Sequence, residues 1–500
     1  MTVSFNYIPA GNGVSVPLFY AEMNNSQASY LSGQPQRALL IGQKLAAGSQ
    51  AVNTPIIVAS VSQDISLFGQ GSMLARMMAN YRGIDPVGEV WCIAVADNGA
   101  GVAATGTITV TGPATAAGTI NLYIAGQLVQ VAVGSTDTAN TVAASINTAI
   151  NAAADLPATS AVASAVVTLT CKWKGATGND IIVLDSFLGA AGQQTLPIGI
   201  ALAYVAMASG ASNPILSGAI TAMGDDAYDF VIHPYTDTTS LTAIGTELGD
   251  VSGRWSYIRQ VYGHAYSANR GILSALTTFG SALNDQHATI AAIDVDCPHP
   301  CWEYAAAYGA ANAVGIKADP ARPTQTLKLT GLLAPRAGKR FLYTERTSLL
   351  TYGVATSSVV NGVLQIERAI TTYQKNSYGQ ADVSYLDSET LHTAAFVLRA
   401  LRSAITTKYP RHKLANDGTR FGAGNAIVTP KVIRSEILAQ YKALEDLGLV
   451  ENTDLFAQYL IVERDPTNVN RLNVLFPPDY VNQLRVFAVL NQFRLQYAGT

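Results

Sequence analysis

The chain has 500 residues, more than a single hydrophobic core fills, so we expect two or three domains. Charged residues make up only 13%, about half the usual share, and no block of five or more basic residues suggests a nucleic-acid binder. The N-terminus lacks the features of a signal peptide, and the most apolar run, 196–211, is too short and interrupted to span a membrane. Four cysteines are too few for a disulfide scaffold, so we expect a cytoplasmic, reducing site of synthesis.

Both ends of the chain show the alternation of apolar and polar residues that is typical of strands. Pro17 lies within the first of these segments, and proline is confined to edge positions in sheets. Isolated terminal strands need a partner sheet, and two interpretations stay open. The strands complete the sheet of their own chain, or they add to a sheet in a neighbouring subunit. The alternating residues are Val3, Phe5, Tyr7, Val14, Val16, Leu18, Phe487, Val489, Phe493, Leu495 and Tyr497.

Two regions carry apolar strand-like runs separated by helical patterns. Such alternation favours an α/β layer, and because both regions have this character we expect one core built from both. The first region has predicted strands at 38–42, 55–61 and 90–96 and a helix at 72–81; the second has strands at 229–232 and 288–293 and a helix around 267–284.

The intervening segment, 98–217, has a different composition. It holds only six charged side chains in 120 residues and is dense in Ala, Gly, Thr and Val. Strand-like alternation occurs at 107–110 and 128–133, turn signals include Gly112-Pro113, and one helix is expected near 138–153. We predict an inserted, mostly β domain.

The last third holds the clearest helices. One has an apolar face from Leu391 to Ile405, with Asp387 and Ser388 placed to cap its start. A second begins with Thr429 as cap and Pro430 in the first turn, and it ends at Gly448. Both apolar stripes indicate core packing and not a cofactor site.

The residues with catalytic or metal-binding character form no complete site. Cys297, His299 and Cys301 offer three zinc ligands, but structural zinc needs four, so we favour a proline-fixed turn before a helix. No G-x-S-x-G motif accompanies the candidate bases, and the Gly69-Gln70-Gly71 stretch lacks the rest of a phosphate loop. We predict no catalytic residue, no metal and no cofactor. The candidate bases are His233, His264, His287, His392 and His412.

A series of ordered motifs resembles the tail sheath proteins of Mu-like contractile phages. The longest reads DPARPTQTLKLTGLLAP at 319–335, followed by YTER at 343–346, IERAITTYQ at 366–374 and DVSYLD at 382–387. Near the end come ERDPTN at 463–468 and RLNV at 471–474. The match spans essentially the whole chain, and several ordered motifs together are specific where one alone would be weak.

The resemblance implies a structural sheath subunit of the virion, assembled in the bacterial host cytoplasm. Such subunits stack as six-fold rings around a tail tube and contract from a metastable extended state to drive the tube through the host envelope. The implied partners are further copies of the chain, the tail tube protein, and baseplate and tail terminator proteins, with no nucleic acid and no membrane insertion. A phage-derived bacteriocin particle would carry the same kind of sheath.

The resemblance also implies an architecture, a subtilisin-like but catalytically inert α/β core with a β insert facing outward and strand-forming terminal arms that reach into neighbours. Lys408, Arg411 and Lys413 either contact the tube or a neighbour, or form an ordinary solvated helix end. The predicted segments are an N-terminal arm (1–30), the core (31–97 and 218–380), the outer domain (98–217), an inner C-terminal domain (381–484) and a C-terminal strand arm (485–500).

Two other classes of function fit the sequence less well. A serine-type hydrolase on an α/β core with a β accessory domain would fit the fold class, but the motifs of a catalytic triad are missing. A β-rich surface adhesin is opposed by the α/β regions and by the lack of a signal peptide. A shared fold does not by itself carry an activity.

Overall fold

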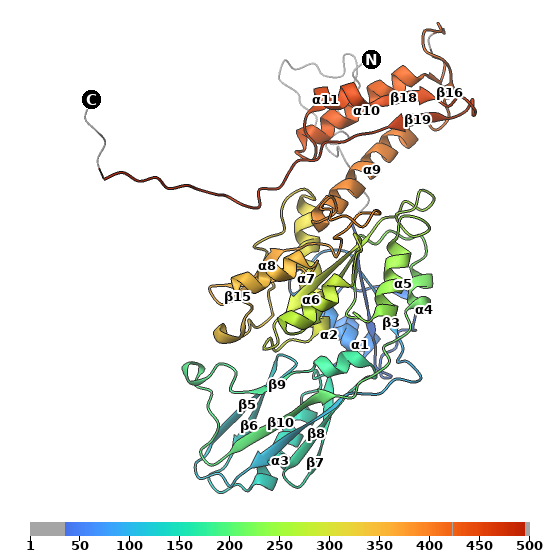
Figure 1. Cartoon of the computed structure of the whole chain (residues 1–500). Coiled ribbons are helices and arrows are strands. Elements are labelled where there is room, and N and C mark those ends of the chain that lie inside the picture. The colour runs from blue at the N-terminus through green and yellow to red at the C-terminus, as the bar shows by residue number, and fades with distance from the viewer. Residues whose placement is uncertain (1–35, 423, 496–500) are drawn as a thin grey trace, which may run out of the picture. The chain divides into compact units, whose positions relative to one another are not determined.

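A computed structural model describes residues 36–422 and 424–495 (Figure 1). Its centre is a six-stranded sheet in the order β13-β12-β11-β1-β3-β2, parallel except for β2. β1 pairs with β3 on one side and with β11 on the other, so strands from before and after the predicted insert share one sheet. The strands are β1 Ala38–Gln43, β2 Pro55–Ile57, β3 Val90–Val95, β11 Phe230–Ile232, β12 His264–Arg270 and β13 Ala288–Ile293.

The helices of this core cover a sheet whose central strands are buried on both faces. α7 (Cys301–Ala318) packs against β12 and α2, and every residue of its first three turns is buried. Ser72 caps α2 by accepting a hydrogen bond from the Ala75 amide. The remaining core helices are α1 Val61–Phe68, α2 Met73–Arg82, α4 Ser217–Met223, α5 Thr238–Leu248 and α6 Leu273–Ser281.

The low-charge segment folds into two sheets of its own and a helix. A four-stranded sheet has the order β10-β4-β8-β7, and a three-stranded sheet has the order β6-β5-β9. α3 (Ala139–Ala152), capped by Thr138, packs against β6 and β7. The strands are β4 Thr105–Thr111, β5 Gly118–Ile124, β6 Gln127–Val133, β7 Ala158–Ala163, β8 Val166–Cys171, β9 Val183–Asp185 and β10 Ala201–Ala208.

The C-terminal part has a separate small core. Tyr441 stacks on Phe456 with ring centroids 3.7 Å apart, and Ile433, Ile437 and Leu444 surround them. The elements of this part are α9 Ser388–Lys408, β16 Lys413–Leu414, β17 Ile427–Val428, α10 Pro430–Asp446, α11 Thr453–Tyr459, β18 Ile461–Arg464 and β19 Leu472–Leu475. Between α7 and α9 the chain forms α8 Tyr343–Thr351, β14 Thr356–Val360 and β15 Val363–Arg368, of which α8 packs on α6 and β14 on β13.

Three predicted elements are wrong in their bounds or contacts. The helix expected over 267–284 begins only at Leu273, because residues 264–270 form strand β12 between β11 and β13. The strand expected over 55–61 ends at Ile57, and α1 starts at Val61. Asp387 stands at the N-cap position of α9 but makes no capping hydrogen bond, because its carboxylate binds two arginines.

Buried histidines give the core an acid-sensitive interior. Nε2 of His392 lies 3.0 Å from the Tyr266 hydroxyl, and Nε2 of His264 lies 2.8 Å from Oγ1 of Thr289. Burial lowers the pKa of His233 to about 4 and that of His392 to about 3. The native protein therefore keeps these rings neutral at pH values where the unfolded chain protonates them.

We expect the free energy of unfolding to fall as the pH drops from 6.5 towards 4. The histidine contribution is fully present above the unfolded pKa near 6.5, and the loss amounts to about 3 kcal/mol for His233 alone. Urea unfolding at several pH values should show a shallower acid decline for His392→Gln than for the wild type. His412→Gln, at an exposed position, is the matched control; equal slopes in all three proteins would contradict this account.

Candidate assembly surfaces

The C-terminal tail follows the body of the protein as far as Arg485. Val450 bridges Tyr480, the Glu451 amide donates to the Asp479 carbonyl, and Nε2 of Gln483 donates to the Ala321 carbonyl at 3.1 Å. These contacts fix the path of the tail across the segment between α10 and α11 and the segment after α7. The contacts therefore position the backbone of the tail as far as Gln483.

Arg485 anchors the tail to the start of α9. Its Nη2 atom lies 3.1 Å from both Asp387 Oδ1 and Glu389 Oε1. The Glu389 carboxylate is completely buried and also accepts two hydrogen bonds, from the amide and the hydroxyl of Thr324. Arg368 binds the same Asp387 carboxylate through two hydrogen bonds of 2.8 and 2.9 Å. Charge-assisted hydrogen bonds of this kind are among the stronger polar contacts, so the anchor defines where the free tail begins.

Arg485→Met should loosen the tail without unfolding the body. Without the guanidinium, chymotryptic cleavage after Tyr480 should become roughly tenfold faster, since a hydrogen bond to a charged group contributes about 1.5–3 kcal/mol. Cleavage after the exposed Phe487 should not change. Mass spectrometry of timed digests separates the two cuts, and Arg471→Met at an exposed arginine is the control. If Arg485→Met is cleaved after Tyr480 at the wild-type rate, the anchor is ruled out.

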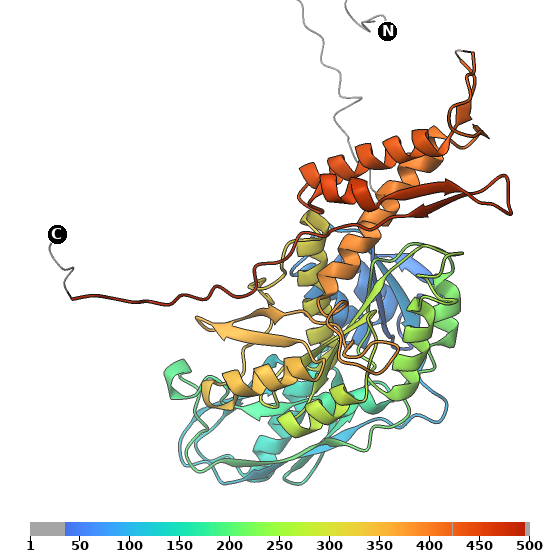
Figure 2. The same ribbon diagram turned by 45° about the horizontal axis from the view of Figure 1, so that its top comes forward.

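Beyond Arg485 the tail exposes its apolar side chains. Residues 486–495 form no strand, and Figure 2 shows them as an extended trace. Phe487, Val489, Phe493 and Leu495 are all highly exposed, and they pair with no sheet in the part of the chain that the structure describes. Tyr497 and the predicted N-terminal residues, Val3 to Leu18, lie outside the described residues. The strand-exchange role of all these residues stays a prediction.

A two-stranded hairpin in the C-terminal part of the chain has open edges. β18 pairs antiparallel with β19 from Ile461↔Leu475 to Arg464↔Leu472, and no other described strand pairs with either. β18 packs on α10, while Ile461, Val474 and Leu475 remain exposed. Two strands alone are marginally stable, and unpaired strand edges are ready to accept a further strand.

The predicted basic contact residues divide into two kinds. Lys408 pairs with Glu436, with Nζ 2.5 Å from Oε1. Arg411 and Lys413 are exposed, and among the described residues neither has an ion pair. Their role in contacting a tube or a neighbour stays a prediction. Arg346, in contrast, pairs with Glu367 within the chain at 2.8 Å.

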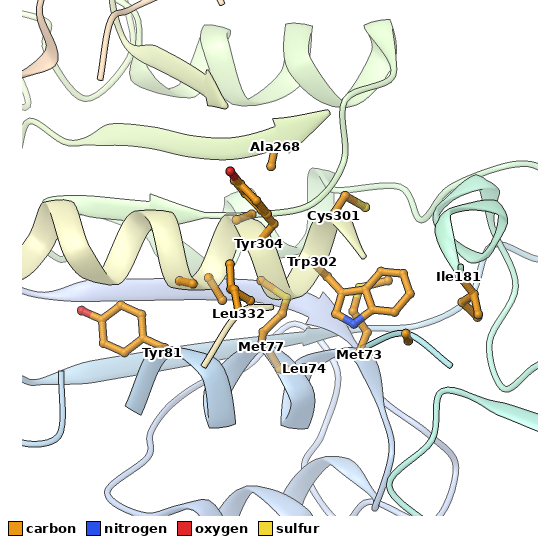
Figure 3. Close-up of a cluster of buried hydrophobic side chains, with 14 of the residues drawn as sticks. Met73, Leu74, Met77, Tyr81, Ile181, Ala268, Cys301, Trp302, Tyr304 and Leu332 are labelled. Atoms are coloured by element: carbon orange, nitrogen blue, oxygen red, sulfur yellow. The ribbon is translucent and has the colours of Figure 1, made fainter. Parts of the chain in front are cut away.

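The Cys297–Cys301 segment lies where the insert meets the core. Arg270 links the two parts. Its Nε lies 2.5 Å from Oδ1 of Asp180 in the insert, and Nη1 of the same arginine donates to the Cys297 carbonyl. The Trp302 ring meets Trp173 of the insert edge to face at 5.0 Å. Figure 3 shows Cys301 and Trp302 at the start of α7 in the same buried cluster as Met73 and Ile181.

A buried charge network completes this joint. Glu303, with 0% exposure, accepts from Arg76 at 2.7 Å and lies 2.8 Å from Nδ1 of His299. Burial opposes ionisation of Glu303, but Arg76 and His299 hold the pKa of its carboxyl below the ordinary value. Gly126 of the insert lies so close to the His299 ring that a Cβ there would be 2.4 Å from it. No group of metal-ligating side chains that could hold an ion occurs within residues 36–422 and 424–495. Cys297 and Cys301 pack in the buried cluster at the joint, and His299 pairs with Glu303 beside them.

The candidate bases do not assemble a hydrolytic site. His264 contacts Thr289, and both residues are buried, so no substrate reaches that hydroxyl. His287 pairs with Asp250 at 3.0 Å, but no serine or cysteine side chain is hydrogen-bonded to a histidine in the described chain.

The described helices also include none that is long and apolar enough to cross a membrane.

Comparisons with known proteins identify the class. Residues 209–372 match the model of the phage tail sheath protein central domain, and residues 380–494 match that of the phage tail sheath C-terminal domain. The Mu-like prophage FluMu tail sheath protein of Haemophilus influenzae is 41% identical over 499 residues, covering 99% of this chain and 100% of that protein. These matches define a structural protein of a phage tail, and the hydrolase alternative finds no support. The chain belongs to the contractile phage tail sheath family.

Solved structures of sheath proteins are also similar. The sheath tail protein of Desulfitobacterium hafniense aligns with a TM-score of 0.47 at 12% identity, covering 94% of this chain and all of that one. The sheath tail protein of Listeria innocua gives 0.48 at 12% identity, with 90% and 93% covered. The contracted helical sheath of the anti-feeding prophage gives 0.47 at 10% identity, with 97% and 100% covered.

Proposed function

We propose that copies of this chain polymerise as stacked six-fold rings around a tail tube and contract from a metastable extended state, driving the tube through the host envelope. Membership of the sheath family supports this proposal. The observation that carries it is that the chain has both an anchored tail with exposed apolar side chains and a hairpin with two open edges. Both features are incomplete in one chain, and a second copy supplies what each lacks.

The link between copies is strand addition. Residues 486–495 of one copy pair with a free edge of β18–β19 in the next, which turns a marginal two-stranded unit into a larger sheet. The N-terminal alternation (Val3, Phe5, Tyr7, Val14, Val16 and Leu18) supplies a second strand of the same kind. The main-chain hydrogen bonds hold the copies together, and the alternating side chains set the register.

Contraction follows from two competing packings of the same subunits. The extended packing persists behind a kinetic barrier set during assembly, and the contracted packing is lower in free energy. Strand tethers keep neighbours together by effective concentration while the bodies rotate and slide. No nucleotide is needed in such a mechanism, and the α/β core acts as an inert, subtilisin-like body.

The remaining contacts follow the same model. The low-charge insert, 98–217, faces outward, and the exposed Arg411 and Lys413, together with Lys408, face an acidic tube or neighbour. Baseplate and tail terminator proteins lie at the two ends of the sheath. The virion subunit is assembled in the bacterial host cytoplasm.

Negative-stain electron microscopy of the purified chain tests the proposal directly. We expect long striated tubes, because nothing except further copies is needed to complete the hairpin sheet. A uniform monomer that also fails to polymerise when co-expressed with its tube and baseplate proteins would reject the proposal.

A further inference from the structure

The loop between α5 and β12, residues 249–263, presents apolar side chains to solvent. Val251 is 89% exposed, Tyr257 80% and Ile258 74%. We call these three side chains the 257 tip. Scattered exposed apolar residues need no explanation, but these belong to a loop whose base is unusually well fixed.

A completely buried arginine holds the base of the loop. Arg254 has 0% exposure, and its guanidinium donates to the carbonyls of Tyr262 and Gly224, each at 3.0 Å, and to that of Asp226. It also pairs with Glu247 at the end of α5. Burying a guanidinium is costly unless its donors are satisfied, so these contacts fix several turns of backbone at once.

A second arginine neutralises the charge beside the tip. Arg259 binds both carboxylate oxygens of Glu247, at 2.9 and 3.0 Å, and Asp225 at 2.9 Å. Trp255 donates from Nε1 to the Gly263 carbonyl at 2.8 Å and stacks on His287. The loop is therefore held from α5, from the turn at 224–226 and from His287 just before β13.

The backbone of the loop is strained in the same place. Gln260 has φ +52° and Tyr262 φ +54°, and neither is a glycine. A bulky residue in the left-handed region is uncommon and persists only where its surroundings determine the conformation. The left-handed backbone at Gln260 and Tyr262 is unfavourable by itself, and so is the desolvation of the Arg254 guanidinium. The sequence therefore maintains this loop shape at some loss of stability.

We infer that the 257 tip docks on a neighbouring copy of this chain in the assembled sheath, an inference that rests on the proposed function. A rigid Tyr–Ile pair binds with little loss of conformational entropy, as aromatic anchors of pre-organised binding loops do. The tip is uncharged, and it matches the charge-poor surface of a chain with only 13% charged residues.

The small size of the tip identifies the occupant. An aromatic side chain buries about 150–250 Å², so the three side chains supply a few hundred Å², well below the roughly 800 Å² per partner of a stable interface. Such a contact forms only where other contacts already hold the two molecules together. A neighbouring copy tethered by strand addition meets that condition, whereas a separate protein that bound the tip alone would not stay bound.

Site-specific photo-crosslinking tests the inference. p-Benzoyl-phenylalanine replaces Tyr257, and the variant is mixed as a minor fraction into wild-type protein so that tubes still form. We expect a crosslinked dimer whose peptides map to two copies of this chain, at a yield roughly tenfold above that of a preparation in which every copy lacks residues 486–500 and none can tether a neighbour. Ile258→Cys labelled with a thiol-reactive photo-crosslinker gives a second readout, because all four native cysteines are buried and stay unlabelled.

The outcomes separate the inference from the proposed function. Wild-type protein that forms no tubes, even when co-expressed with its tube and baseplate proteins, overturns the proposed function, and the inference with it. Tubes that form normally but give no crosslink from either position overturn the inference alone. Crosslinks to the tube protein or to another virion protein overturn the choice of occupant.

Discussion

A variant that lacks residues 486–500 should fold as a monomer and form no tubes. The deleted residues lie after the Arg485 anchor, and the described ones, 486–495, are mostly exposed, so the melting temperature of the body should not change. Sheath formation should be lost entirely, because the open edges of β18 and β19 then lack their incoming strand. Sedimentation velocity and negative-stain microscopy measure the two properties on one sample.

Two related variants refine this result. Gln492→Ser changes a polar side chain of the tail and should leave assembly intact. A deletion of residues 1–20 should also abolish polymerisation while leaving a folded monomer, if the N-terminal alternation supplies the second strand. Long tubes from either truncation would reject strand exchange through that end.

Glu303→Ala should destabilise the core by about 3–5 kcal/mol, the loss expected when one partner of a buried ion pair is removed. The change leaves Arg76 and His299 without their shared acceptor at the joint between the insert and the core. Urea unfolding followed by tryptophan fluorescence reports on this region, because Trp173 and Trp302 meet there.

Two control variants separate charge from packing. Glu303→Gln keeps the shape of the side chain and should lose less stability than the alanine variant. Arg471→Ala breaks a mostly exposed pair with Asp465, 3.7 Å apart, and should cost no more than about 1 kcal/mol. If Glu303→Ala unfolds at the same urea midpoint as Arg471→Ala, the buried network of Glu303 with Arg76 and His299 adds nothing to stability.

Local patterns predicted the elements that carry their own signal. Thr429 and Pro430 mark the start of α10 because capping and a fixed proline φ act within one turn, and Gly448, at φ +72°, follows its end. The apolar runs of β1 and β3 indicate strands that are covered on both faces. In each of these elements the forces that set the structure lie within a few residues.

Elements set by distant partners were missed. Ser267, Ala268 and Asn269 look helical in isolation, but they lie in a strand because β11 and β13 flank it. Asp387 has the sequence position of a helix cap, yet its partners are Arg368 and Arg485, the latter 98 residues away. The buried position of Arg254 depends on backbone carbonyls, which carry no side-chain signature in a sequence.

The candidate assembly residues were only partly accessible to sequence reasoning. Alternation identified the tail, and the single-chain structure leaves Phe487 and Val489 exposed with no strand of their own to join. The pinning of Arg485 was not predicted, because nothing local distinguishes it from any other arginine. The 257 tip was also missed, since a Tyr–Ile pair in a loop has no periodicity.

The fixed position of Arg485 limits how far the residues after it can extend from the body. Residues 486–495 are proposed to pair with the next copy, and a fully extended chain spans at most about 3.3–3.6 Å per residue, so the last of these ten residues lies within roughly 35 Å of Arg485. In a sheath built by strand exchange, the anchor on one body and the receiving hairpin on the next cannot move farther apart than this without breaking the link. The stroke between adjacent copies therefore has an upper bound that is set by covalent geometry alone, and lengthening the segment between Arg485 and Phe487 would raise it by one residue's span at a time.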